Sequence, residues 1–171
     1  METYYPFAFL EGQEVTSWAG TEMALSADES GDLAENVVWE SEAIPFLQFI
    51  SLDLTLKDGS ALRLLSQHED GTGYHGLYLI GGFAQITEVG TTSPSGIYRS
   101  RLLTNLPTGI VRILSTRMDG PNATLEALVG VQDDVIRLLA AEVHETWTGE
   151  LKIAEADESI LVQLNGKRPA D

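Results

Sequence analysis

The sequence contains no cysteine and few basic residues. The absence of cysteine excludes a disulfide scaffold, a thiolate metal site and a thiol nucleophile. Lysine and arginine number 10 against 26 aspartate and glutamate, which gives a formal net charge of −16. Because contacts with phosphate groups require cations, this charge argues against nucleic acid and against an anionic membrane as the partner.

Long hydrophobic runs are also missing. The longest apolar stretches have four or five residues, far fewer than the ~20 that a membrane-spanning helix needs. The N-terminal segment carries Glu2 where a signal peptide would be basic. We therefore expect a cytoplasmic protein. With 171 residues, of which 43% are hydrophobic, the composition is typical of a globular chain, and we expect one domain over residues 1–171.

The clearest pattern in the sequence is a two-residue alternation of apolar side chains. Every second residue of 50–56 is aliphatic, which places four apolar side chains on one face of a strand. Asp58-Gly59 then supplies a tight turn, and Leu62 and Leu64 resume the alternation on the return strand. Further strands are expected at 76–80, 83–89, 97–104, 109–117, 123–131, 135–145, 150–154 and 159–164.

Turn sequences separate these strands, among them Pro107-Thr108-Gly109, Asp119-Gly120-Pro121 and Asn165-Gly166. Many short strands joined by such turns favour a mainly β fold, either an antiparallel sandwich or a partly open barrel. Helices are expected to number one or two at most. The best candidate is 21–36, which reads equally well as a polar loop because Gly31 interrupts it and its apolar residues form no stripe.

Two parts of the chain resemble each other and suggest an internal repeat over 46–90 and 109–165. Each part has a strand, an acidic turn, a strand containing Arg-Leu-Leu, a segment with histidine and acids, and an aromatic residue two positions before glycine. A duplication would produce two similar β-meanders that bury their apolar faces together. Chance similarity stays the alternative, because the alignment needs at least one single-residue gap.

Charge is distributed unevenly along the chain. Residues 1–56 contain eleven acids and no lysine or arginine, whereas the segment from Val89 to Met118 contains four arginines and no acid. Arg99 and Arg101 are two positions apart on an expected strand and therefore point to one face. The simpler interpretation is that acids of the N-terminal region neutralise these arginines within the molecule. The alternative is a dipolar binding surface.

Catalytic and metal motifs are weak. The residue pattern of a dinucleotide-binding loop occurs at Gly71-Thr-Gly-Tyr-His-Gly76. Because a strand and not a helix is expected after it, we interpret this segment as a hairpin loop. Glu142 and His144 share a strand face, and His68 and His75 flank the corresponding loop of the other repeat. Their spacing does not match that of a zincin, and we expect solvated turn or strand-edge residues. No catalytic, cofactor-binding or metal-ligating residue is assigned.

These observations favour a non-enzymatic acidic protein that binds and neutralises a basic protein partner. An immunity protein directed against a bacterial toxin or nuclease is one example, because surplus carboxylates attract a cationic target and imitate phosphates. Trp18, Trp39 and Trp147 are expected to pack in the core, with Trp39 also a candidate for exposure beside acids. The expected contact residues lie in the N-terminal region that lacks bases: Glu22, Asp28, Glu29, Asp32, Glu35, Trp39, Glu40 and Glu42.

Two other classes of function stay open. The first is a β-sandwich or barrel that binds a small molecule or carbohydrate, with weak metal-assisted hydrolysis as an extension. Its polar groups would come from His75, Tyr78, Arg101 or Trp147. The second is a structural or accessory module that self-associates through an exposed strand edge. Both a monomer and a homodimer are compatible with the sequence.

Overall fold

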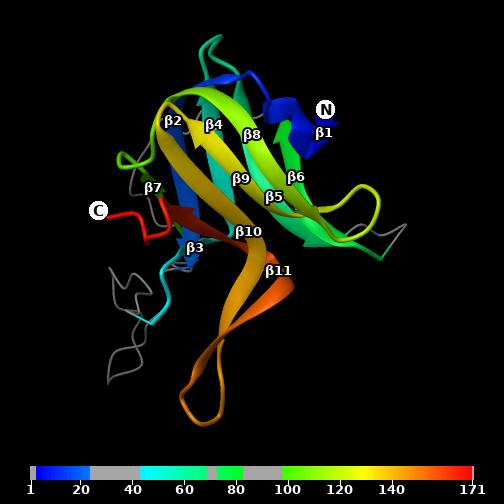
Figure 1. Cartoon of the computed structure of the whole chain (residues 1–171), viewed down its shortest axis with the longest axis vertical. Helices are drawn as coiled ribbons and strands as arrows, with labels where there is room; N and C mark the ends of the chain where they lie inside the picture. Colours follow the sequence, from blue (N-terminus) through cyan, green and yellow to red (C-terminus); the bar gives the residue numbers. More distant parts are fainter. Residues whose placement is uncertain (1–2, 24–42, 69–72, 83–97, 171) are drawn as a thin grey trace.

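The structure is a computed structural model that describes residues 3–23, 43–68, 73–82 and 98–170 (Figure 1). Strands dominate these residues, and one short 3-10 helix, η1 (Phe7–Leu10), lies near the N-terminus. The strands are β1 (Thr3–Tyr5), β2 (Glu14–Met23), β3 (Leu47–Phe49), β4 (Ser51–Leu56), β5 (Ala61–His68), β6 (His75–Gly81), β7 (Tyr98–Leu102), β8 (Gly109–Met118), β9 (Thr124–Val131), β10 (Asp134–Glu145) and β11 (Leu151–Leu164).

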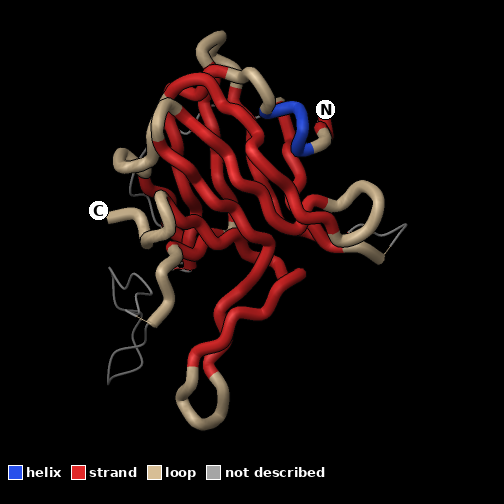
Figure 2. The backbone as a smooth tube through the Cα atoms, in the orientation of Figure 1, coloured by secondary structure: helices blue, strands red, loops and turns tan. Residues whose placement is uncertain are grey.

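Six of the strands close into an antiparallel barrel in the order β2, β4, β5, β6, β9 and β8 (Figure 2). Leu77 of β6 pairs with Thr124 of β9, and a short contact at Glu14 and Val15 joins β2 to β8. The remaining strands extend this barrel: β1 pairs with β6, β7 with β2, β10 with β9, and β3 with β11. The prediction of a mainly β, antiparallel fold of the sandwich or barrel type is confirmed.

The apolar alternation in the sequence fills the barrel. Leu52 and Leu54 of β4 and Leu64 of β5 are fully buried, as the predicted strand faces require. Trp18 of β2 lies in the same core and donates a hydrogen bond from Nε1 to the carbonyl of Pro107 at 2.9 Å. At roughly 1.5–3 kcal/mol per buried aliphatic side chain, this core is the main source of stability.

The predicted turn at 57–60 is also present. The Asp58 side chain accepts hydrogen bonds from the backbone N–H and the hydroxyl of Ser60, at 2.9 and 2.6 Å. These two bonds lower the pKa of the Asp58 carboxyl. An aspartate that binds the backbone two residues ahead fixes the local turn, so the hairpin between β4 and β5 is set by sequence-local chemistry.

Several details differ from the sequence-based expectations. Residues 21–23 belong to strand β2 and not to a helix; the rest of the 21–36 segment, like the expected strand 83–89, lies outside the described residues. The segments 150–154 and 159–164 form one strand, β11. The internal repeat and the single domain stay predictions. Within the described part of the chain, no helix has the length and apolar character needed to cross a bilayer.

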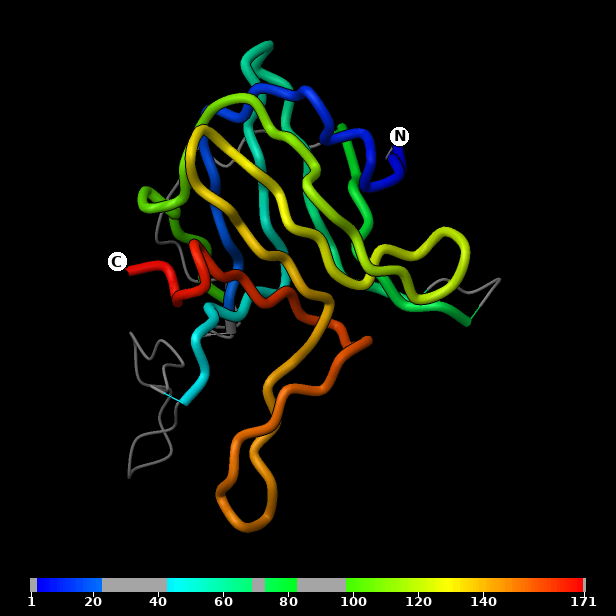
Figure 3. The backbone as a smooth tube through the Cα atoms, viewed as in Figure 1, coloured from blue at the N-terminus to red at the C-terminus, as the bar shows by residue number. Residues whose placement is uncertain are grey.

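The hairpin of β10 and β11 has two parts. Near the barrel, Ala140 pairs with Ile160; one step further, Ala141 pairs with Glu155, so residues 156–159 lie outside the ladder. We call residues 141–155 the arm, because they continue away from the barrel (Figure 3). We call the interruption at 156–159 the neck. Within the neck, Ala156 has a φ of 58°, which is rare for a non-glycine residue.

Candidate functional site: the acidic arm and its neck

The tip of the arm, residues 146–150, is held by its own hydrogen bonds. The backbone N–H of Thr146 donates to the carbonyl of Glu150, and Gly149 N–H donates to the carbonyl of Thr146, both at 2.8 Å. The Thr146 hydroxyl accepts from Glu150 N–H at 3.1 Å. Gly149 has a φ of +81°, which favours glycine. The tip is therefore a defined turn within the hairpin.

This turn displays Trp147, whose exposed fraction is 97%. The expectation that Trp147 packs in the core is wrong, whereas it holds for Trp18, which is 2% exposed. A tryptophan at the end of a projecting turn has no neighbouring strand face to cover it. Because a large aromatic side chain gains much free energy from burial, an exposed one on a rigid support is typical of an interaction hot spot.

Acidic side chains accompany Trp147 on the arm. The arm has four glutamates and one lysine, Lys152. Glu155 is engaged by Arg117, and Glu150 lies 3.5 Å from Lys152 in a pair whose side chains are both more than 60% exposed. Such an exposed pair contributes little free energy. Glu142 and Glu145 form no ion pair with any basic residue in the described part of the chain.

An ion-pair network ties the base of the arm to the barrel. Both terminal nitrogens of Arg117 in β8 donate hydrogen bonds to Glu155 of β11, at 2.9 and 2.8 Å. The Nε of Arg117 donates a hydrogen bond to Glu126 of β9 at 2.9 Å. Arg137 of β10 donates to the other oxygen of Glu126. Four strands therefore share one chain of charge-assisted hydrogen bonds, which fixes where the arm leaves the barrel.

Two groups of this network have shifted pKa values, the carboxyl of Glu126 and the guanidinium of Arg117. Burial raises the pKa of Glu126, but hydrogen bonds from Arg137 and Arg117 outweigh it, so the net effect is a lower pKa. The hydrogen bonds to Glu155 and Glu126 raise the pKa of Arg117. Both residues are therefore charged at neutral pH.

Apolar contacts support the same region. Val143 and Leu151 of the arm pack against a second, smaller cluster that lies apart from the barrel core and contains Ile44, Phe46, Leu139, Ala141 and Leu161. The backbone N–H of Val143 also donates to Gln48 Oε1 of β3 at 2.8 Å. Packing and hydrogen bonds thus anchor the arm as far as its last ladder pair, Glu145 with Leu151.

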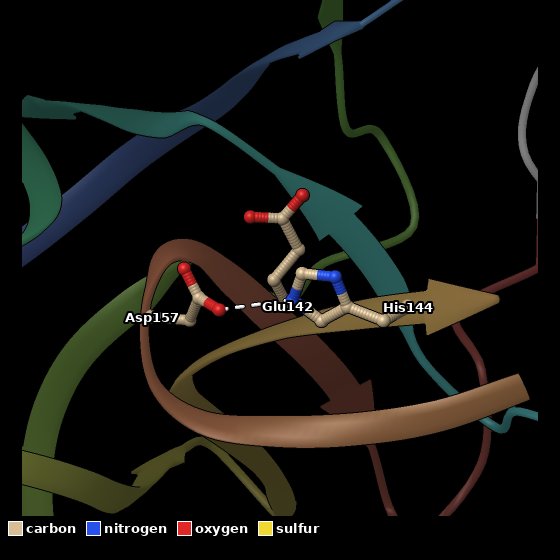
Figure 4. Close-up of side chains that lie close together, drawn as sticks. All are labelled: Glu142, His144 and Asp157. Atoms are coloured by element: carbon tan, nitrogen blue, oxygen red, sulfur yellow. Dashed lines mark hydrogen bonds and ion pairs between the residues drawn. The ribbon is translucent and has the colours of Figure 1, made fainter. Parts of the chain in front are cut away.

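The neck brings together Glu142, His144 and Asp157 (Figure 4). One donor atom from each residue lies within 4.8 Å of the others. His144 Nε2 and Asp157 Oδ2 are 2.9 Å apart. This hydrogen bond raises the pKa of His144 and lowers the pKa of Asp157. The carboxylate of Glu142 makes no hydrogen bond or ion pair within the described residues.

A serine and a histidine also meet behind the neck, and their contact is structural. Ser66 Oγ lies 2.8 Å from His75 Nε2, and both side chains are buried. The Ser66 hydroxyl donates its proton to the backbone carbonyl of Asp157. Because a hydroxyl has one proton, His75 must donate to Ser66 and cannot act as its base. This geometry does not produce an activated nucleophile.

The predicted contact residue Glu22 is inside the protein. Arg99 donates to Glu22 Oε1 through Nε and Nη2, at 2.9 and 2.6 Å, and Arg101 Nε lies 3.2 Å from the same oxygen. Glu22 is 4% exposed and therefore offers no carboxylate to a partner. The intramolecular interpretation holds for this residue. The other predicted contact residues lie outside the described residues: Asp28, Glu29, Asp32, Glu35, Trp39, Glu40 and Glu42.

The remaining predicted residues divide into two groups. Glu142 and His144 are brought together, whereas His68 stands at the exposed end of β5 with its ring 6.0 Å from that of His75. Trp147 lies in the turn between β10 and β11, whereas Arg101 lies in β7 beside Glu22 and the ring of Phe49, so the structure does not bring the two together. Sequence reasoning missed Asp157, the third member of the neck cluster.

Comparison with known proteins adds no assignment. The chain matches no protein-family model, no curated protein and no solved structure.

Proposed function

We propose that this protein is a non-enzymatic binding module that uses the arm to engage a basic protein partner and neutralise it, as an immunity protein neutralises a toxin or nuclease. The observation that carries the proposal is Trp147, which is 97% exposed on a hydrogen-bonded turn. An indole in this position is available to fill an apolar pocket or to stack on a cation of the partner.

The charge around Trp147 supports a basic partner over other partners. Glu145 and Glu150 flank the tip, and the whole chain carries −16. A lysine or arginine side chain of the partner can contact the indole face and a carboxylate together. The same charge repels phosphate groups, which disfavours nucleic acid and anionic membranes at this tip.

The position of the arm supports docking without a large rearrangement. Ion pairs and packing anchor its base, and backbone hydrogen bonds order its tip. A pre-ordered element loses less conformational entropy on association than a disordered one. The long-range field of the acidic chain would raise the association rate with a cationic target.

The proposal is tested with a fluorescently labelled oligoarginine peptide as the probe, by fluorescence anisotropy at low ionic strength. We expect saturable binding that weakens as salt is added, because exposed charges are screened beyond about 10 Å at 0.1 M salt. The matched pair of variants is Glu145→Gln on the arm and Asp133→Asn in the exposed turn between β9 and β10.

Both substitutions remove one negative charge, so their comparison isolates the position of that charge. We expect Glu145→Gln to weaken binding severalfold more than Asp133→Asn. Equal effects of the two substitutions would mean that only net charge attracts the peptide, and that result would overturn the arm as the docking element.

A further inference from the structure

We propose that Glu142, His144 and Asp157 form a binding site for a divalent transition-metal ion, with Zn²⁺ as the representative ion. The set offers one imidazole nitrogen and two carboxylates. Mixed nitrogen and oxygen donors are the ligands that zinc and neighbouring first-row metals accept in proteins. This site lies at the neck and is separate from the indole and carboxylates at the arm tip.

The spacing of two of the three donor atoms fits a common metal ion. Zinc lies about 2.0–2.2 Å from nitrogen and oxygen ligands. Two donors at that distance, separated by angles between octahedral and tetrahedral values, lie about 2.8–3.6 Å apart. His144 Nε2 and Asp157 Oδ2 are 2.9 Å apart, which lies within this range. The third donor atom, from Glu142, lies within 4.8 Å of both.

The backbone explains why these donors meet. Glu142 and His144 are two positions apart on β10, so their side chains share one face of the strand. Asp157 comes from the neck, where residues 156–159 leave the ladder. The carbonyl of Asp157 accepts a hydrogen bond from Ser66 of β5, which holds this backbone against the barrel. The three donors therefore come from two supported segments.

The electrostatics also favour a cation. Two carboxylates are held near each other, and the imidazole of His144 is the basic group in direct contact with one of them, Asp157. Glu142 has no hydrogen-bond donor, so binding a metal would cost it no existing bond. His144 is 53% exposed on its side chain, which leaves room for solvent to complete the coordination shell. An ion bound here would join β10 to β11 at the start of the arm.

The experiment is a titration of the whole chain with Zn²⁺ by isothermal calorimetry, with Mg²⁺ for comparison. We expect one saturable Zn²⁺ site and no comparable Mg²⁺ binding, because an imidazole ligand favours zinc over magnesium. Each of Glu142→Gln, His144→Ala and Asp157→Asn should weaken Zn²⁺ binding by at least about tenfold. Glu142→Gln is the cleanest of these, since it breaks no hydrogen bond in the folded protein.

Two matched controls remove the same chemical groups outside the set. Asp133→Asn removes a carboxylate from the exposed turn between β9 and β10, and His68→Gln removes an exposed imidazole. Both should bind Zn²⁺ as the parent does. Substituting Co²⁺ for Zn²⁺ adds a spectroscopic check, because its visible absorption should change in His144→Ala and not in His68→Gln. Absence of saturable Zn²⁺ binding, or binding that Glu142→Gln and His144→Ala leave unchanged, would overturn the site.

Discussion

The two halves of the β10–β11 hairpin place apolar side chains in different environments. In the half that joins the barrel, Leu138, Ile160 and Val162 are fully buried. In the arm, Ile153 is 37% exposed and Trp147 is 97% exposed. One continuous hairpin therefore supplies barrel core on one side of the neck, and on the other side an arm whose packed residues, such as Val143 and Leu151, lead to an exposed tip. The difference separates residues that stabilise the fold from residues that are exposed to solvent at the tip.

The largest expected effect tests the barrel half. Leu138→Ala removes a fully buried side chain from β10 and should lower the free energy of unfolding by about 2–5 kcal/mol. The cost combines lost burial with the cavity that remains. Urea denaturation followed by far-UV circular dichroism measures it. A loss below about 1 kcal/mol would show that this half of the hairpin is not part of the cooperative core.

The closure of the barrel gives the next largest effect. A Cβ atom added at Gly76 would lie 2.9 Å from the backbone nitrogen of Thr124 and 3.0 Å from backbone atoms of Ala123. Backbone cannot move aside as a flexible side chain does, so Gly76→Ala should cost about 1–3 kcal/mol. The same denaturation assay checks it, and an unchanged midpoint would contradict the close approach of β6 and β9.

The ion-pair network at the base of the arm predicts a pH dependence. The pKa of Glu126 is lower in the folded protein than in an unfolded chain. Its stabilising contribution is therefore complete above the unfolded pKa and is lost as the pH falls through the folded pKa. Glu126→Gln should cost about 1 kcal/mol at neutral pH, since its arginine partners are partly screened by solvent.

The measurement is the unfolding free energy of the parent and of Glu126→Gln between neutral and acidic pH. The difference between the two proteins should shrink as the pH falls below the usual range for glutamate. A difference that stays constant with pH would mean that the Glu126 charge does not contribute through the network.

The sequence predicted the regular part of the fold well. The alternation over 50–56 and its return at Leu62 and Leu64 required no knowledge of the tertiary structure. Strand β2 was missed for a physical reason. Its register shifts between Val15 and Ser17, so Val15 and Trp18 are both buried although they are three positions apart. A bulge of this kind destroys the two-residue period on which strand prediction depends.

The candidate site was less predictable. The shared face of Glu142 and His144 followed from their spacing, but Asp157 approaches them because four residues of the neck leave the ladder. Ala156 in the neck has a positive φ, and because this position holds neither glycine nor asparagine, the sequence gives no sign of that conformation. Trp147 was expected in the core because tryptophan is usually buried, and the turn residues Thr146 and Gly149 were the signal against that expectation.

The proposed docking role of the arm is tested most directly by substituting Trp147, the change with the smallest expected effect on stability. Trp147→Ala should change the free energy of unfolding by less than about 0.5 kcal/mol, because almost the whole side chain of Trp147 is exposed to solvent. The same substitution should weaken binding of the labelled oligoarginine peptide at least about tenfold, as loss of an interaction hot spot does. Binding that Trp147→Ala leaves unchanged, together with a clear loss of stability, would contradict the account of the arm as a docking element.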